Sequence, residues 1–194
     1  MEGFQPSLFD RQELAPSGLS YWPGFVSAAE ERLLVDRIAQ LNLVPFQFGA
    51  YEGKRRVASF GWKYDFSRRH LEPAAPPPPW IAPFASRVEA FASFKPDAIG
   101  HILFTEYAPG AAIGWHRDKK DFDLVFGLSL AAACPFRFRR KSGKRWERFT
   151  LDVEPRSLYL LTGEARKLWE HSIPPMAALR YSVTFRTLAC DPCK

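Results

Sequence analysis

Alternation of apolar and polar residues from Gly100 onward constrains the fold most strongly. In this half of the chain, apolar residues recur at every second position, the period of a β-strand with one buried face. The runs that keep this period are His101–Tyr107, Leu124–Leu130, Phe136–Lys141, Trp146–Val153, Ser157–Leu161 and Arg180–Leu188. The 194 residues also include 17 Pro and 12 Gly, so short strands joined by turns are favoured over long helices.

The first half of the chain predicts an irregular lead-in over residues 1–24 and then two amphipathic helices. The first helix begins at a capping box formed by Ser27 and Glu30 and stops before Pro45. The second follows a proline-rich connector, and its apolar positions are Ile81, Phe84, Val88 and Phe91. With 46% hydrophobic residues, the chain can bury the core of one domain. We therefore expect an α+β protein, mainly β: a jelly-roll-like double sheet braced by the two helices.

Positive charge is concentrated in two windows. The chain carries 27 Lys and Arg against 21 Asp and Glu, and residues 137–148 hold seven of these bases with one acid, Glu147. A second window, residues 54–70, combines six basic residues with aromatic neighbours. Basic residues interleaved with aromatic ones favour a polyanion with stackable bases, although two solvated hairpins would give the same pattern.

Membrane and secretion signals are missing from the sequence, so we expect a cytoplasmic protein without membrane partners. We also expect a monomer. No stretch reaches the roughly 18 apolar residues of a membrane helix, and the first 24 residues lack the apolar core of a signal peptide. Three cysteines make no disulfide framework, which fits a reducing compartment. Cys190 and Cys193 form a C-x-x-C pair, but a structural zinc site would need a second pair, and the role of these thiols stays open.

Two histidines and one aspartate form the candidate metal site. His116-x-Asp118 is followed later in the chain by His171. Two His and one carboxylate on one face of a metal leave three positions open, a set typical of non-haem Fe(II) oxygenases. The H-x-D spacing places both side chains on one side of a strand end or turn, although a core histidine is often only hydrogen-bonded. The remaining histidines, His70 and His101, receive no role, since four histidines cannot all be ligands in one facial site.

The last predicted strand adds a row of polar side chains. Alternation divides it into a polar face and an apolar face, the polar one being Arg180, Ser182, Thr184 and Arg186. Guanidinium forks pair bidentately with carboxylates, whereas Lys offers only a point charge. We expect this row to face a cavity that holds a dicarboxylate, with an exposed edge strand as the alternative.

Together these pieces resemble the AlkB family of Fe(II)/2-oxoglutarate-dependent dioxygenases. The resemblance covers Ala98 to Leu188 and rests on three motifs in order: Tyr107-Ala108-Pro109-Gly110, His116-x-Asp118 with His171, and Arg180-x-Ser182-x-Thr184-x-Arg186. It implies a single dioxygenase domain over residues 1–194. Within it, residues 100–189 would form a double-stranded β-helix (jelly roll) core, and residues 1–99 an N-terminal extension with the substrate lid.

The resemblance also implies the cofactors and their ligands. Fe(II) would be held by the catalytic residues, which are His116, Asp118 and His171. The co-substrates would be 2-oxoglutarate and O2. The distal carboxylate of 2-oxoglutarate would bind to Tyr107 and Arg180, while Arg186 would serve the end nearer the metal.

Three positions depart from the family pattern. Thr105 and Ser182 stand where the family commonly has Asn, and both remain hydrogen-bonding groups. With Thr184, they complete the predicted co-substrate pocket. Lys120 stands where AlkB itself has an acid that reads the damaged base, so this position bears directly on the substrate.

We expect the substrate to be nucleic acid, DNA or RNA, presented as a single strand or a flipped base. The reaction would be oxidative demethylation of an N-alkylated base. In the lid window, Trp62 and Tyr64 would flank the base, and Arg55 and Arg56 would hold phosphates. Two alternatives remain: hydroxylation of a protein or small molecule at the same iron site, and nucleic-acid binding without catalysis.

Overall fold

The structure is a computed structural model that describes residues 15–48, 50–65, 68 and 70–189. Cys190 and Cys193 lie outside the described residues. The elements in chain order are β1 (Leu19–Trp22), α1 (Ala28–Ala39), β2 (Val44–Phe48), β3 (Tyr51–Asp65), β4 (His70–Pro73), the short 3-10 helix η1 (Pro79–Ile81), α2 (Ala82–Phe91), β5 (Ile99–Tyr107), β6 (Ile113–His116), β7 (Phe122–Leu130), β8 (Cys134–Ser142), β9 (Arg145–Val153), β10 (Leu158–Leu161), α3 (Gly163–Lys167), β11 (Glu170–Ile173) and β12 (Arg180–Leu188). The helices in this part of the chain are all too short or too polar to cross a membrane.

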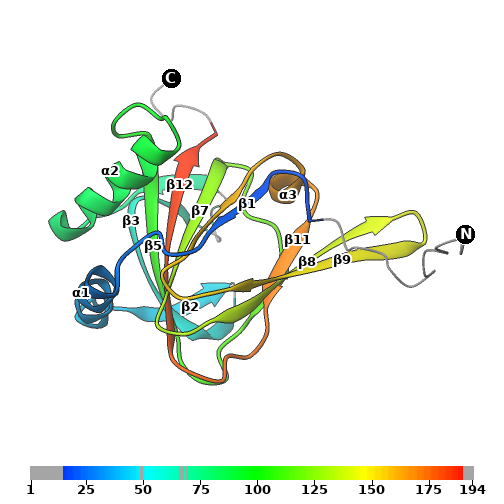
Figure 1. The fold of residues 1–194 in the computed structure, drawn as a ribbon, viewed down its shortest axis with the longest axis horizontal. Helices are drawn as coiled ribbons and strands as arrows, with labels where there is room; N and C mark the ends of the chain where they lie inside the picture. The colour runs from blue at the N-terminus through cyan, green and yellow to red at the C-terminus, as the bar shows by residue number, and fades with distance from the viewer. Residues whose placement is uncertain (1–14, 49, 66–67, 69, 190–194) are drawn as a thin grey trace, which may run out of the picture.

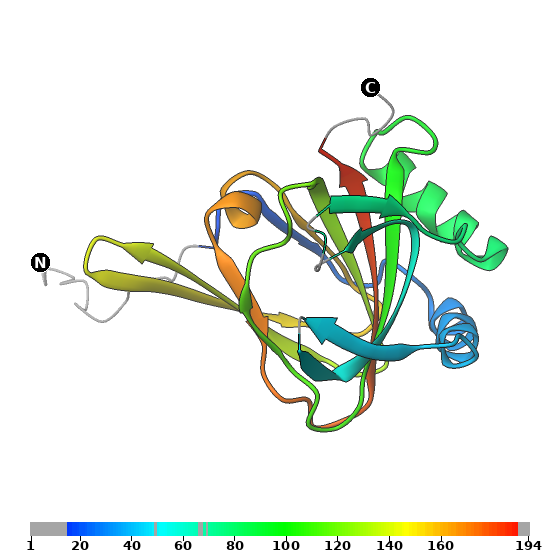
Figure 2. The same ribbon diagram turned by 180° about the vertical axis from the view of Figure 1, so that it is seen from behind.

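Two antiparallel sheets face each other across the molecule (Figures 1 and 2). The main sheet has the strand order β1-β10-β7-β12-β5-β3-β2, with β4 paired to β3, and the smaller sheet has the order β6-β11-β8-β9. All six strands predicted from the alternating pattern are present. The predicted fold class, mainly β with a jelly-roll double sheet, is confirmed.

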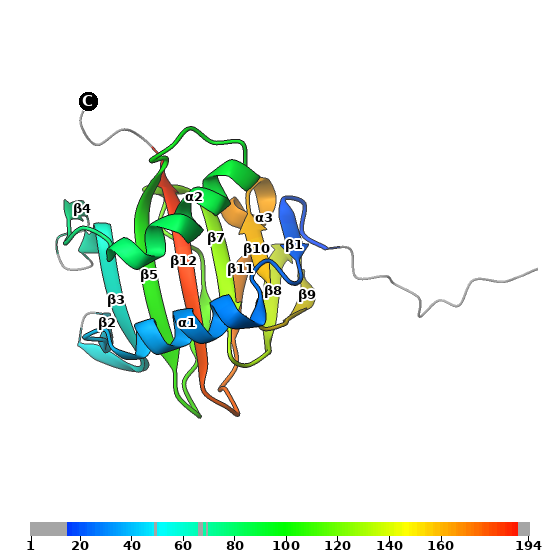
Figure 3. The same cartoon turned by 60° about the vertical axis from the view of Figure 1, so that its left-hand side comes forward.

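Helices α1 and α2 lie side by side on one face of the main sheet (Figure 3). That face is apolar: the side chains of Tyr181, Val183 and Phe185 on β12 belong to the cluster that packs against Leu34 and Ile38 of α1. The opposite face of the main sheet therefore looks toward the smaller sheet, and it carries the polar residues of β12.

The N-terminal half contributes more strand than its sequence predicts. The expectation of an irregular lead-in over residues 1–24 is wrong at Leu19–Trp22, because this segment pairs with β10 as the edge strand β1. Pro45, expected only to end a helix, lies in the edge strand β2, where its missing N–H removes no central ladder bond. The long strand β3 pairs with β5 up to Gly61, whose φ is +77°, and with β4 beyond it.

A close approach between two strands shapes the space between the sheets. Tyr159 on β10 is directly opposite Gly127 on β7, and its ring lies over the glycine. An added Cβ at Gly127 would lie only 2.0 Å from Cζ of Tyr159. The glycine therefore lets the tyrosine ring fold down onto the sheet.

We expect Gly127→Ala to lower the free energy of unfolding by roughly 1–3 kcal/mol, because the buried ring must move off the sheet. The measurement is urea denaturation followed by tryptophan fluorescence. Gly53→Ala on β3 is the matched control, since its added Cβ would make only ordinary contacts, 3.4 Å or longer. Equal stability of the two variants would contradict this view of the packing.

Candidate active site

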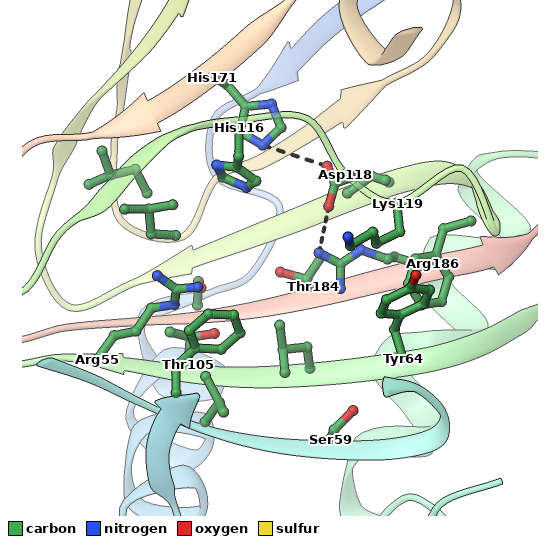
Figure 4. Close-up of a pocket in the computed structure, with 18 of the residues that line it drawn as sticks. Arg55, Ser59, Tyr64, Thr105, His116, Asp118, Lys119, His171, Thr184 and Arg186 are labelled. Atoms are coloured by element: carbon green, nitrogen blue, oxygen red, sulfur yellow. Dashed lines mark hydrogen bonds and ion pairs between the residues drawn. The ribbon is translucent and has the colours of Figure 1, made fainter. Parts of the chain in front are cut away.

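A cavity of about 680 Å³ opens between the two sheets (Figure 4). Its size is in the range of small-molecule sites in proteins. The main sheet lines it with residues of β3, β5 and β12, and the smaller sheet lines it with residues of β6 and β11. The cavity contains every side chain of the predicted metal trio, His116, Asp118 and His171.

The trio is assembled by strand pairing and one turn. His116 ends β6 and is the direct partner of His171 on β11, so the two side chains share a face and their ring centroids are 4.3 Å apart. Asp118 follows two residues after His116, and its Oδ2 lies 3.6 Å from Nε2 of His171. Hence residues far apart in the sequence meet at one point of the cavity wall.

Burial keeps both histidines of the trio neutral. It lowers the pKa of His171 to about 3, with a further contribution from His116 nearby. Burial also lowers the pKa of His116. Nδ1 of His116 bonds to the carbonyl of Gly114 at 2.9 Å, so Nδ1 carries the hydrogen and Nε2 keeps its lone pair. A neutral imidazole with a free lone pair is the form that binds metals.

The donor chemistry of the trio fits Fe(II): two imidazole nitrogens and one carboxylate on one side of a cavity. No group of three His, Cys, Asp or Glu in the described residues has closed metal-binding geometry.

A chain of hydrogen bonds leads from Asp118 to the strand β3. Arg186 donates from Nη2 to Oδ1 of Asp118 at 2.8 Å and from Nη1 to Nδ1 of His101 at 3.1 Å. Because Arg186 can only donate, Nδ1 of His101 accepts, and its Nε2–H is left to donate to Oγ of Ser59, 2.9 Å away. Burial would raise the pKa of Asp118, but Arg186 above all holds it well below its usual range.

Arg166 on α3 fixes the backbone around Asp118. Its buried guanidinium donates to the carbonyl of Asp118 at 3.1 Å, to that of Lys119, and to that of Phe122 at 2.7 Å. Three carbonyls of one loop are thus bound by one side chain. The loop conformation that presents the Asp118 carboxylate depends on this contact.

The predicted co-substrate residues lie in and behind the cavity wall. Five of the six share the lining with the metal trio, and these are Thr105, Tyr107, Ser182, Thr184 and Arg186. Arg180 is 1% exposed and does not itself line the cavity. Its guanidinium lies 4.9 Å from the ring centroid of Tyr107, and Nε donates to Oγ of Ser129. Nη1 of Arg180 is buried without a hydrogen-bond partner among the described residues.

This unpartnered donor fits an anionic co-substrate. A buried guanidinium N–H without an acceptor is costly, and a carboxylate that reached it would remove the cost. Polar groups of Tyr107, Thr105 and Ser182 lie on the same face of the main sheet as Arg180. The arrangement fits the distal carboxylate of 2-oxoglutarate at this end of the cavity.

The structure separates the predicted substrate residues. Arg55 and Tyr64 line the cavity. Arg56 follows Arg55 on β3 and lies on the opposite face of the strand. Arg56 bonds to Glu106 at 3.2 Å and to the carbonyl of Leu43 at 2.8 Å, as strand alternation requires.

Two further residues predicted to contact the substrate do not line the cavity. Trp62 is paired opposite Pro73 on β4 and is not among the cavity-lining residues. Lys120 is exposed and outside the lining, whereas the preceding Lys119 lines the cavity with its Nζ 4.7 Å from the ring centroid of Tyr64. The cation expected near the substrate is therefore Lys119.

Comparison with known proteins identifies the family of this fold and site. The profile of the 2OG-Fe(II) oxygenase superfamily matches residues 18–186. The chain belongs to this superfamily. Its cofactors are accordingly Fe(II), 2-oxoglutarate and O2. The resemblance to AlkB-like members, drawn from the motifs, is also confirmed by relatives of known name.

Two curated relatives and one solved structure show the extent of the likeness. The alkylated DNA repair protein ALKBH8 homolog of Arabidopsis thaliana is 29% identical, over 96% of this chain and 62% of the relative. The alpha-ketoglutarate-dependent dioxygenase AlkB of Salmonella typhimurium is 35% identical, over 54% of this chain and 51% of the relative. The structure of OsALKBH1 has a TM-score of 0.65 at 16% identity, covering 90% of this chain and 98% of that one, which shows the shared fold. The chain thus spans half to two thirds of these curated relatives.

We expect His101→Phe to weaken metal binding about 10-fold, because loss of the His101 hydrogen bond leaves Arg186 less firmly placed beside Asp118. The aromatic replacement keeps a ring against Phe122, on which His101 stacks at 4.8 Å. Mn(II) affinity, measured by isothermal titration, is the readout. Ser59→Ala removes only the last hydrogen bond of this series, the one between His101 and Ser59, and should have a smaller effect. A folded His101→Phe variant with unchanged Mn(II) affinity would refute the coupling.

Proposed function

We propose that this protein is an AlkB-like dioxygenase that removes N-alkyl groups from bases in nucleic acid. The observation that carries the proposal is the meeting of His116, Asp118 and His171 in one cavity with the polar face of β12. We take the enzyme to be a cytoplasmic monomer, as its sequence predicts. When bound, Fe(II) and 2-oxoglutarate supply the oxidation of a substrate C–H bond by O2.

The chain itself contributes ligands, charge and orientation. His116, Asp118 and His171 would hold the metal, with Arg186 keeping the carboxylate ionised and directed. Arg180 and Tyr107 would hold the distal carboxylate of 2-oxoglutarate, as their positions on the same face permit. The target base would enter between β3 and the loop after β6, where Tyr64 and Lys119 lie together.

The charge of the cavity wall bears on which base is accepted. The described residues of the lining include five cations, which are Arg55, Lys63, Arg117, Lys119 and Arg186, and one carboxylate, Asp118, which is paired with Arg186. A cationic base such as 1-methyladenine would meet like charges there. We therefore propose that neutral N-methylated bases are better substrates than cationic ones.

Arg180→Lys should weaken 2-oxoglutarate binding at least about 10-fold, because a single ammonium cannot reproduce the bidentate geometry of the guanidinium. Isothermal titration of 2-oxoglutarate into the Mn(II)-loaded protein measures this. Arg56→Lys, on the opposite face of β3, is the control and should bind normally. Wild-type affinity in a folded Arg180→Lys variant would mean that the carboxylate is held elsewhere.

Formaldehyde release from methylated strands tests the proposed reaction. We expect release from DNA or RNA oligonucleotides that carry N6-methyladenine to exceed release from those that carry 1-methyladenine. His171→Ala should abolish both, since it removes a metal ligand. If no methylated strand yields formaldehyde while 2-oxoglutarate still binds, the substrate is a protein or a small molecule instead.

A further inference from the structure

The hairpin of β8 and β9 extends away from the double sheet (Figures 1 and 2). Strand alternation gives this hairpin two faces of different composition. The inner face carries Phe136 and Phe138, which pack between the sheets, and Arg140 beyond them. The outer face carries the residues in between, Arg137 and Arg139 among them, and is continued by the outward residues of β6, β9 and β11.

The charge of Arg140 on the inner face is neutralised within the protein. Arg140 donates to Glu147 and to Glu164, both at 2.6 Å, and its guanidinium lies 4.9 Å from the ring centroid of Trp169. One cation therefore has two carboxylate partners. Arg140 therefore serves a structural network rather than a free surface.

The outer face has an excess of positive charge. We define it by its charged and aromatic residues: Trp115, Arg117, Arg137, Arg139, Lys141, Trp146, Arg148, Asp152 and Glu170. It thus holds five cations and two carboxylates. Arg139 is directly opposite Arg148 on the neighbouring strand, and like charges in this position destabilise a sheet. A bound polyanion would relieve that repulsion.

Two tryptophans give the outer face stacking capacity. The guanidinium of Arg139 lies between them, 4.4 Å from the ring centroid of Trp115 and 4.6 Å from that of Trp146. Glu170 accepts from Nε of Arg139 at 2.7 Å and fixes it in place. Trp146 is nevertheless 43% exposed, which is unusual for a large aromatic side chain. Aromatic rings beside arginines suit the bases and phosphates of a single strand.

The outer face also adjoins the cavity. Trp115 and Arg117 belong to both, because β6 is the edge strand of the smaller sheet and borders the cavity. A nucleotide strand that places one base in the cavity must continue across one of its borders. We propose that the outer face binds the single-stranded segment flanking the target base; this inference rests on the proposed function and names where its substrate binds.

Removal of two exposed outer-face cations tests the proposal. The probe is an unmodified, fluorescein-labelled 15-nucleotide strand, and its anisotropy is measured with the Mn(II)-loaded full chain between 50 and 200 mM salt. The variant is Lys141→Gln with Arg148→Gln. Since each phosphate contact on a single strand contributes about 0.7 to the salt slope, the slope should fall by about 1.4. Affinity at 50 mM salt should fall about 10-fold.

A matched variant removes the same charge from the same hairpin. Lys144→Gln with Arg145→Gln alters the turn and the inner side, and should keep the wild-type slope. Trp146→Ala should weaken binding with little change of slope, because stacking is not a phosphate contact. Equal slopes for the two charge variants, or no strand binding by the wild type, would overturn the proposal. Binding of the Lys141 and Arg148 variant to phosphatidylserine vesicles is measured as well. If this variant loses vesicle binding while its strand binding stays intact, the outer face binds an anionic membrane surface instead, and the proposal is overturned.

Turnover separates this proposal from the proposed function. The ratio of formaldehyde release from a methylated 15-mer to that from a methylated trinucleotide should fall in the Lys141 and Arg148 variant and stay unchanged in the control. If the wild type releases no formaldehyde from any methylated strand, the proposed function fails. The salt slopes then still decide whether the outer face binds single-stranded nucleic acid.

Discussion

The buried ion pair between Arg186 and Asp118 is the interaction on which the rest of the site depends. Both side chains are mostly buried, and an isolated carboxylate there would be driven toward its neutral form. Arg186 offsets this cost, and His101 in turn holds Arg186. Removing one partner of such a pair leaves an uncompensated charge, at a cost of about 3–5 kcal/mol. The pair therefore links the stability of the sheet to the ionised form of Asp118, the proposed metal ligand.

Local periodicity predicted the part of the site that lies on regular strands. The alternation over Arg180–Leu188 correctly predicted which residues form the polar face of β12. The side of a strand on which a side chain lies depends only on its position within that strand. The same rule, applied to β3, would have separated Arg55 from Arg56. The composition of residues 54–70 does not distinguish the two faces of a strand.

Other features depend on contacts that a single sequence does not display. The strands β6 and β11 have only four residues each and carry too few positions for a clear period. Trp62 and Tyr64 both pair with β4 beyond Gly61, yet only Tyr64 lines the cavity, a difference that strand alternation does not predict. Arg166 binds a loop more than forty positions earlier, and its sequence context contains no sign of those carbonyls.

The position of Arg166 has a consequence for how the site opens. Arg166 on α3 and His171 on β11 belong to one short segment, so the residue that clamps the Asp118 loop and one of the proposed ligands are carried together. A local opening of that segment releases both at once. We therefore expect the proposed metal site to open as one cooperative unit, with the loop amides losing protection from hydrogen exchange together with the amides of α3 and β11.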